Sequence, residues 1–287
     1  MKISTPISVF NDVFGIKKTI DIMQSAGFDA LDFSATIEEY NTDVHDKDYY
    51  IEIKKYALDK GMCFNQAHAP YPSSYKTEEQ SEEAFKKIVT SMKNASYLGV
   101  PVIIVHPCQH LDYCKKENVD FLFEYNMKFY RRLLPYCEEY GIKIAVENMW
   151  QYPGMISHST CSRPEEFIQY VDGISSQWAV ACLDIGHTVL VREQPDEFIR
   201  KLGKDRLKCL HIHDVDGIDD LHTFPYMGIT DWDSVMKALA DIGYSGDFTY
   251  EANSFYRGKP AELYPNYAKL QADIAKHLVS KFNDYSK

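Results

Sequence analysis

Short apolar and β-branched runs alternate along the whole 287-residue chain with longer stretches of helical periodicity. Such alternation is typical of βαβ units, in which helices join parallel strands. Eight runs are predicted as strands, and several are almost continuously apolar, as expected for parallel strands buried on both faces. The runs begin at Ile3, Phe28, Met62, Val102, Ile142, Trp178, Leu207 and Asp247.

The stretches between these runs carry apolar residues at helical spacing. We predict helices over residues 15–26, 78–98, 121–140, 164–171, 232–242 and 262–282. Glycine, a common residue at helix ends, marks five of the helix-to-strand junctions, at Gly27, Gly61, Gly99, Gly141 and Gly243. No linker-like segment interrupts the alternation, so residues 1–287 are expected to form one domain.

Eight consecutive βα units favour the α/β fold called the (β/α)₈ or TIM barrel over an open doubly wound sheet. An open sheet usually has a glycine-rich phosphate loop after its first strand. Here that turn reads SVFNDVFG, and the chain has neither this loop nor a P-loop motif. In a barrel, chemistry belongs to residues at the carboxyl ends of the strands, because the loops there converge on the barrel mouth.

Charge and hydropathy disfavour several classes of partner and location. The 42 acidic and 31 basic residues give a formal net charge of -11, which disfavours nucleic acid and anionic membranes as partners. No apolar run approaches the ~20 residues of a membrane helix, and the start lacks the apolar core of a signal peptide. We expect a cytoplasmic protein whose seven scattered cysteines stay reduced. The sequence leaves the oligomeric state open, and a homo-oligomer is one option.

Six successive strand ends carry a residue of a type that binds metals. From the third strand to the eighth, they are His68, His106, Glu147, Asp184, His211 and Glu251. A barrel mouth brings the last inward residues of its strands close together, and carboxylates are rarely buried unless they are paired or coordinated. Crowded carboxylates repel one another unless a cation or protons compensate them. The pattern therefore favours a metal site over a set of ion pairs.

The donor set bears on the identity of the metal. Glu147, Asp184, His211 and Glu251 would surround a divalent cation with mostly oxygen ligands, which suits Mn²⁺ or Mg²⁺. The additional histidines shift the preference toward Zn²⁺, and Co²⁺ is a further candidate. We expect one divalent metal ion per chain, with additional Zn²⁺ ions as the alternative.

Several motifs resemble those of the xylose isomerase-like barrels, which include sugar phosphate isomerases and epimerases, ketose 3-epimerases and zinc-dependent AP endonucleases. The motifs are VIIVHP, IAVEN, LDIGH, HIHD and YMGITDWDSVMKALADIGYSGDFTYEA, and the likeness covers nearly the whole chain. In ketose-epimerase-like members, the residues matching Glu147, Asp184, His211 and Glu251 bind one divalent metal. The resemblance implies the same here, with Glu147 and Glu251 also serving as catalytic acid and base.

The reaction implied by the resemblance is isomerisation or epimerisation of a sugar or sugar phosphate. A metal that chelates a carbonyl and the adjacent hydroxyl stabilises the enediolate formed when the neighbouring C–H loses its proton. Epimerisation needs a base on one face of that carbon and an acid on the other, whereas aldose–ketose isomerisation moves a proton between neighbouring carbons. Glu147 and Glu251 could serve either reaction.

Further residues are predicted to contact the substrate. His187 in LDIGH is expected to hydrogen bond a sugar hydroxyl, and Trp150 is the best placed loop aromatic to stack on a sugar. Arg257 and Lys259 could hold a phosphate, although solvated positions are favoured for both. The chain departs from ketose epimerases in NMWQYP after Glu147, which lacks their second glutamate, and in lacking their arginine after the seventh strand. The resemblance therefore implies no particular ketose.

The same resemblance leaves a second function open. AP endonuclease relatives carry three zinc ions, and residues of matching type are present at all nine ligand positions. Asp220 and His222 keep the D-x-H spacing of that set, while His213 could line the pocket. The alternative is therefore a multinuclear zinc phosphoester hydrolase that uses metal-bound hydroxide. The nine positions are His68, His106, Glu147, Asp184, His187, His211, Asp220, His222 and Glu251.

Overall fold

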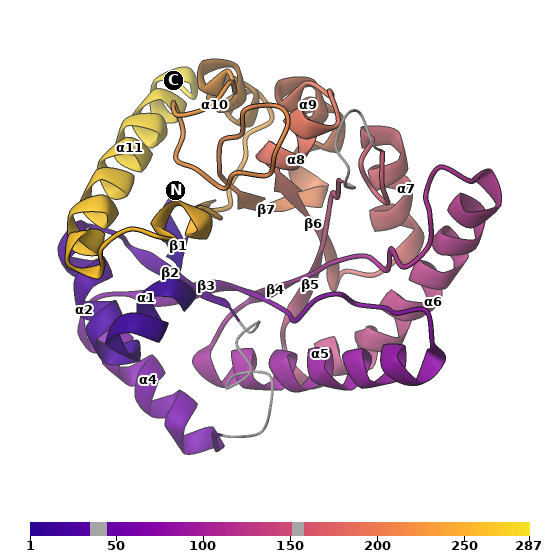
Figure 1. Ribbon diagram of the computed structural model, residues 1–287, viewed down its shortest axis with the longest axis horizontal. Coiled ribbons are helices and arrows are strands. Elements are labelled where there is room, and N and C mark those ends of the chain that lie inside the picture. Colours follow the sequence, from indigo (N-terminus) through magenta and orange to yellow (C-terminus); the bar gives the residue numbers. More distant parts are fainter. Residues whose placement is uncertain (35–44, 151–157) are drawn as a thin grey trace.

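The computed structural model describes residues 1–34, 45–150 and 158–287, and it shows eight parallel strands inside a ring of helices (Figure 1). The strands are β1 (Ile3–Pro6), β2 (Ala30–Ser34), β3 (Cys63–His68), β4 (Val102–Val105), β5 (Lys143–Glu147), β6 (Ala179–Asp184), β7 (Leu207–His211) and β8 (Phe248–Thr249). Their order in the sheet is β7-β6-β5-β4-β3-β2-β1-β8. Every predicted strand is present.

The sheet closes on itself between β7 and β8. A parallel bridge joins Ile212 to Tyr250, just beyond the two strands. The amide of Ile212 donates to the carbonyl of Thr249 at 2.9 Å, and the amide of Glu251 donates to the carbonyl of Ile212 at 3.0 Å. The predicted (β/α)₈ barrel is therefore confirmed, and its closure holds Glu251 beside the end of β7.

Helices cover the outside of the barrel. They are α1 (Ser8–Phe14), α2 (Ile16–Ala26), α4 (Lys47–Asp59), α5 (Glu78–Leu98), α6 (Lys116–Tyr140), α7 (Pro164–Ile174), α8 (Ile185–Leu190), α9 (Pro195–Arg206), α10 (Trp232–Asp241) and α11 (Tyr264–Tyr285), with 3₁₀ turns η1 (Asn253–Tyr256) and η2 (Ala261–Leu263). Apolar helix residues such as Ile20, Met92 and Leu239 are fully buried against the outer face of the strands. The six predicted helices are confirmed, with ends shifted by a few residues.

Helices α1, α4, α8 and α9 are not among those predicted. The sequence favours a first strand that continues to Val9, but β1 stops at Pro6 and α1 begins at Ser8. Proline has no N–H group to continue the strand ladder, which explains the early stop. Helix α8 follows β6 directly, because the side chain of Asp184 caps it by accepting the amide of His187 at 2.6 Å.

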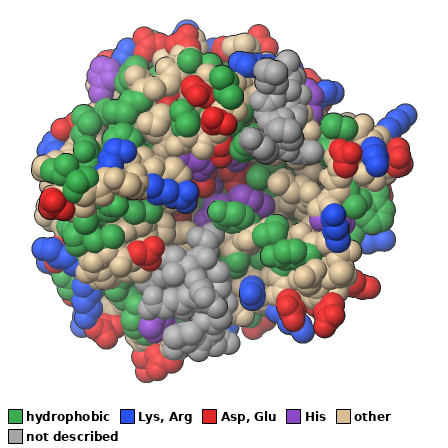
Figure 2. All heavy atoms as spheres, viewed as in Figure 1, with side chains coloured by type: hydrophobic (Ala, Val, Ile, Leu, Met, Phe, Trp, Pro, Cys, Tyr) green, Lys and Arg blue, Asp and Glu red, His purple; other side chains and the backbone are tan. Residues whose placement is uncertain are grey.

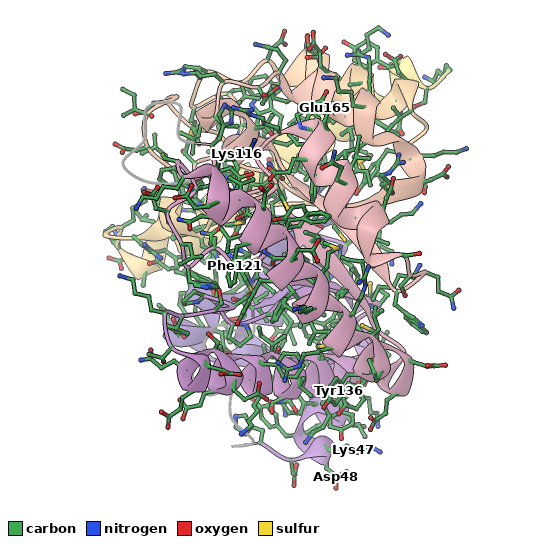
Figure 3. The ribbon with its side chains drawn as sticks, turned by 90° about the vertical axis from the view of Figure 1, so that its right-hand side faces the viewer. Lys47, Asp48, Lys116, Phe121, Tyr136 and Glu165 are labelled. Carbon is green, nitrogen blue, oxygen red and sulfur yellow. The ribbon has the colours of Figure 1, made fainter. Side chains whose placement is uncertain are left out.

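The outer helices keep one side exposed. Helix α6 contacts both α5 and α7, and it runs from Lys116 past the exposed Phe121 to Tyr136 near its end (Figure 3). None of the helices in the described ranges is both long and apolar enough to cross a membrane. The seven cysteines are free thiols in this structure.

Candidate functional site

The carboxyl ends of the strands meet at one face of the barrel, where histidine and acidic side chains lie at the bottom of a hollow (Figure 2). Each of the six ligand-type residues predicted at strand ends is the last residue of its strand or lies within two residues of it. They are His68 in β3, His106 after β4, Glu147 in β5, Asp184 in β6, His211 in β7 and Glu251 after β8. The structure therefore brings the predicted residues into one site.

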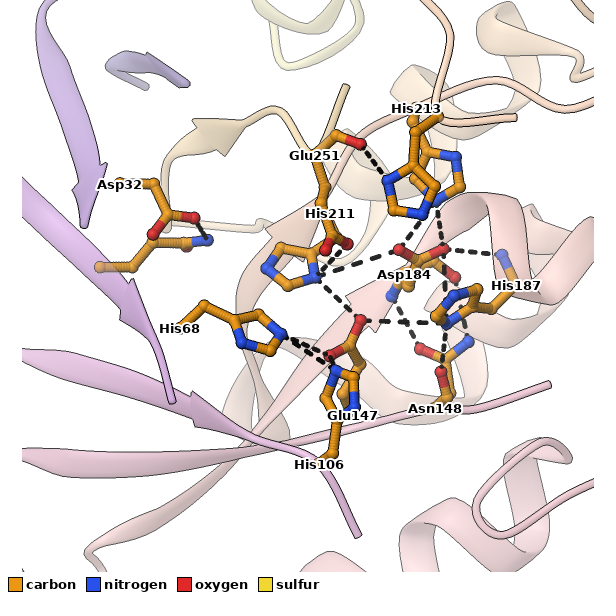
Figure 4. Close-up of polar contacts among 12 residues, drawn as sticks. Asp32, His68, His106, Glu147, Asn148, Asp184, His187, His211, His213 and Glu251 are labelled. Atoms are coloured by element: carbon orange, nitrogen blue, oxygen red, sulfur yellow. Dashed lines mark hydrogen bonds and ion pairs between the residues drawn. The ribbon is translucent and has the colours of Figure 1, made fainter. Parts of the chain in front are cut away.

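Four of these side chains converge on one point (Figure 4). Nδ1 of His211 lies 2.8 Å from Oε1 of Glu147 and 2.8 Å from Oε2 of Glu251. It also lies 4.0 Å from Oδ2 of Asp184. One imidazole nitrogen carries at most one proton, so it cannot satisfy three carboxylates. One ligand atom from each residue lies within 4.8 Å of the others, an arrangement that could hold a divalent cation.

These contacts shift the protonation equilibria of the cluster. Burial lowers the pKa of His211, but the carboxylates of Glu251 and Glu147 outweigh burial and raise this pKa well above its usual value. Burial raises the pKa of Glu147, whereas the imidazoles of His211 and His106 hold it well below its usual value. Without a cation, the cluster therefore favours an imidazolium between carboxylates.

Metal binding at this cluster is expected to strengthen as pH rises. A cation can take Nδ1 of His211 only after that nitrogen loses its proton, so the two compete. Because the pKa of His211 is raised, we expect about one proton to be released per cation and about tenfold higher affinity per pH unit near neutrality. Calorimetric titration of metal-free protein with Mn²⁺, in buffers of different ionisation enthalpy, measures the release. A Kd that does not change between about pH 6 and 8 would contradict this prediction.

A second group of ligand-type side chains lies next to the first. Nε2 of His222 lies 2.8 Å from Oδ2 of Asp220, and Nε2 of His187 lies 3.6 Å from the same oxygen. The rings of His213 and His222 stack with their centroids 4.2 Å apart. One ligand atom from each of the four residues lies within 4.8 Å of the others. The residues predicted to bind substrate or a second metal therefore include a separate cluster.

Asp184 joins the two clusters. Nε2 of His213 lies 3.0 Å and 2.9 Å from the two carboxylate oxygens of Asp184, and one of these oxygens also faces His211. This close approach explains the glycine of the LDIGH motif, because a Cβ on Gly186 would lie 2.0 Å from Cε1 of His213. Any side chain at Gly186 would push His213 away from Asp184, so both clusters depend on this glycine.

His68 and His106 flank the buried Glu147. Nε2 of His106 lies 3.0 Å from Oε2 of Glu147, and Nε2 of His68 lies 3.7 Å from the same oxygen. The ring of Tyr71 stacks on that of His106 with centroids 5.1 Å apart. His68, Glu147 and His211 form a third group whose ligand atoms lie close enough to share a cation.

Two other predicted contacts occupy different surroundings. Nε1 of Trp150 donates to Oδ2 of Asp220 at 3.3 Å, so the indole contacts the second cluster. Residues 151–157, which include the rest of the NMWQYP motif, lie outside the described residues. Nζ of Lys259 lies over the ring of Phe255, 4.0 Å from its centroid. Lys259 is therefore held by its own loop.

A polar cavity opens beside the first cluster, at the ends of β1, β2, β3, β7 and β8. Its lining includes Asp32, Ser34, His68, His211, Glu251 and Arg257. Sequence reasoning missed Asp32 because it is the third residue of β2 and not the last. A carboxylate within the otherwise apolar run ALDF is the signal that could have found it.

The fold and the strand-end residues define a known class of barrel. The family model of the xylose isomerase-like TIM barrel matches residues 20–274, and this chain belongs to that family. D-psicose 3-epimerase of Enterocloster bolteae is 28% identical over 240 residues, which cover 80% of this chain and 74% of the epimerase. The relatives of this chain thus include a sugar epimerase.

Two further matches are an uncharacterized archaeal protein and a solved structure of lower sequence identity. Uncharacterized protein MJ1311 of Methanocaldococcus jannaschii is 28% identical over 190 residues, 64% of this chain and 62% of that protein. This chain thus spans less than two thirds of the archaeal protein. The solved structure of the IOLI protein with a bound zinc atom has a TM-score of 0.80 and 20% identity, covering 98% of this chain and 99% of the other. At that identity the likeness shows a shared fold.

Proposed function

We propose that this protein is a metal-dependent isomerase or epimerase of a sugar or sugar phosphate. The observation that carries the proposal is the convergence of Glu147, Asp184, His211 and Glu251 on one point. Oε2 of Glu251 is buried close to His211, and among the described residues it has no hydrogen-bond partner. The similarity to a D-psicose 3-epimerase over 80% of the chain supports a sugar as the substrate.

Glu147, Asp184, His211 and Glu251 fit a divalent cation because they offer three carboxylates and one imidazole. We infer one Mn²⁺, Zn²⁺, Mg²⁺ or Co²⁺ ion per chain at this position. When bound, the cation supplies a Lewis acid for the carbonyl oxygen of the substrate. The proton transfers are assigned to side chains of the protein.

We assign the proton transfers to Glu147 and Glu251. Each has a carboxylate oxygen 2.8 Å from Nδ1 of His211, so both reach the same small volume. Burial raises the pKa of each carboxyl, but His211 and the other imidazoles lower this pKa by a larger amount. Both groups therefore start as carboxylates that can accept a proton. A carboxylate that takes the substrate proton becomes an acid. Return of a proton to the opposite face gives epimerisation, and return to the neighbouring carbon gives isomerisation.

A multinuclear zinc phosphoester hydrolase is the second candidate. Its support is the separate cluster of His187, His213, Asp220 and His222, which could hold a cation of its own. The net charge of -11 disfavours a polyanion such as DNA as its substrate. The two candidates differ in the number of metal ions that the site must hold.

Metal content separates the two candidates. For protein purified without chelator, an isomerase or epimerase is expected to hold about one divalent ion per chain, and His68→Ala should leave this number unchanged. Plasma mass spectrometry measures the content. His277→Ala, at an exposed position of α11, is the matched control. Two or three Zn²⁺ ions per chain, with fewer in His68→Ala only, would favour the hydrolase.

The remaining assignments concern the domain organisation, the cellular location, the substrate and the oligomeric state. We infer that residues 1–287 act as one domain in the cytoplasm, with a small sugar or sugar phosphate as the partner. Arg257 brings a cationic side chain to the lining of the cavity, so sugar phosphates belong in any substrate screen. Assembly into a homo-oligomer stays a prediction.

A further inference from the structure

Asp32 is a buried carboxyl at the barrel mouth that neither the proposed metal site nor the acid–base pair uses. Its exposed fraction is 2%, and it lines the polar cavity together with His211 and Glu251. Oδ2 accepts a hydrogen bond from Nε2 of Gln66 at 2.9 Å. Oδ1 is buried and has no hydrogen-bond partner among the described residues. Because an unpaired buried carboxylate oxygen is costly, a ligand group is expected at this atom.

The register of the sheet builds this arrangement into the fold. Strands β2 and β3 pair Leu31 with Phe64, and then Asp32 with Gln66, so Asn65 is an extra residue on β3. Such a bulge re-aims the side chains beside it, and bulges are frequent next to active sites. Here Gln66 binds one oxygen of Asp32 and leaves the other without a partner.

His211 carries the complementary group. Its Nδ1 belongs to the proposed metal site, while its Nε2 is buried and has no hydrogen-bond partner in the described chain. A histidine that binds a metal through one nitrogen keeps a proton on the other and normally donates it. Figure 4 shows Asp32 and His211 on neighbouring sides of the site, and both line the same cavity. A buried donor and a buried acceptor therefore border one space.

We propose that a substrate hydroxyl binds between Asp32 and His211, donating to Oδ1 of Asp32 and accepting from Nε2–H of His211. A hydroxyl donates and accepts at once, whereas a carbonyl only accepts and a C–H group does neither. Asp32 is thus a binding residue that selects a polyhydroxylated substrate and discriminates against the sugar deoxygenated at that carbon. This inference rests on the proposed function and deepens it.

Sugar affinity of the metal-loaded Asp32→Asn variant tests the inference. Asparagine can still accept the hydrogen bond from Gln66, but it offers an amide NH₂ in place of the acceptor Oδ1. Asp247→Asn is the matched control, because Oδ2 of Asp247 accepts from Nδ2 of Asn65 at 3.2 Å. Both substitutions replace a carboxyl group beside an amide side chain of β3 with an amide. Asp247, however, precedes β8 and lies at the opposite end of the barrel.

Calorimetric binding of D-fructose, D-psicose, D-tagatose and D-fructose 6-phosphate is expected to weaken roughly 10- to 100-fold in Asp32→Asn. Asp247→Asn should bind these sugars like the wild type. Among the monodeoxy derivatives of the tightest ligand, one should bind the wild type and Asp32→Asn with equal affinity, because it lacks the recognised hydroxyl. If Asp32→Asn does not fold, Asp32→Ser, whose side chain is too short to reach, should give the same loss.

Three results would overturn the inference in distinguishable ways. Equal affinity of every sugar for the wild type and the Asp32 variants would remove Asp32 from the binding site while leaving the proposed function intact. If the Asp32 variants lose metal but bind sugar normally once fully loaded with metal, Asp32 would instead support His211 through a bridging water. Failure of every sugar to bind the wild type would overturn the proposed function together with this inference.

Discussion

Replacement of Glu147 by glutamine is expected to lower proton exchange between solvent and the bound sugar roughly 10²- to 10⁴-fold. Glutamine keeps the shape of the side chain but cannot accept the proton of the substrate C–H group. Glu251→Gln should lower exchange by a similar factor, because both carboxylates lie at Nδ1 of His211. Incorporation of deuterium from D₂O into D-psicose, or into a better substrate found by screening, measures the exchange by NMR.

The control for this experiment separates proton transfer from metal loss, because Glu147 is also a proposed ligand. Exchange is compared at equal metal occupancy, and Glu82→Gln is the surface control, since Glu82 pairs with Arg132 at 2.8 Å on the outer helices. Persistent exchange in Glu147→Gln at full occupancy would sink the acid–base assignment. Sugar binding without exchange in the wild type would instead indicate a binding protein.

Replacement of Asp214 by alanine is expected to lower the free energy of unfolding by about 3 to 5 kcal/mol. Asp214 is fully buried three residues beyond β7, and its carboxylate anchors the loop that carries the second cluster. It accepts five hydrogen bonds, from the amides of Val215, Tyr226 and Thr230, from Oγ1 of Thr230 and from Nε1 of Trp232. Alanine would leave these donors without their acceptor.

Chemical denaturation measures this loss of stability. Asp216→Ala is the matched control, because Asp216 is exposed in the same loop and accepts the amides of Ile218 and Asp219. Solvent can replace Asp216 as the acceptor, so little change is expected there. Equal stability of Asp214→Ala and Asp216→Ala would show that the loop holds its position without Asp214.

Local pattern is sufficient to predict most of the fold, because strand alternation and helical periodicity are properties of neighbouring residues. Helices of six and seven residues, α8 and α1, carry too few turns to show a period, and they begin directly after strands. The start of α8 depends on Asp184 as a helix cap, and the start of α1 depends on Pro6 as the end of β1. Both effects depend on where the preceding strand ends in the barrel.

Strand direction extends this reasoning to the site. All strands of a parallel barrel end at the same face, so ligand-type residues at strand ends can be predicted to meet there. The rule finds His68 and Glu251, which are separated by most of the chain. It misses Asp32, because a residue in the middle of a strand lies at the site only through the tilt and register of the barrel.

By itself, the sequence determined the barrel and the set of side chains at its mouth, since both follow from local periodicity and the direction of the strands. Only the tertiary structure decided how those side chains divide into groups. His213 turns to Asp184 because Gly186 leaves room for its ring, and Asp32 borders the same cavity as His211 beside a bulge in β3. Such pairings depend on barrel closure and on packing between strands far apart in the chain, which no local pattern records.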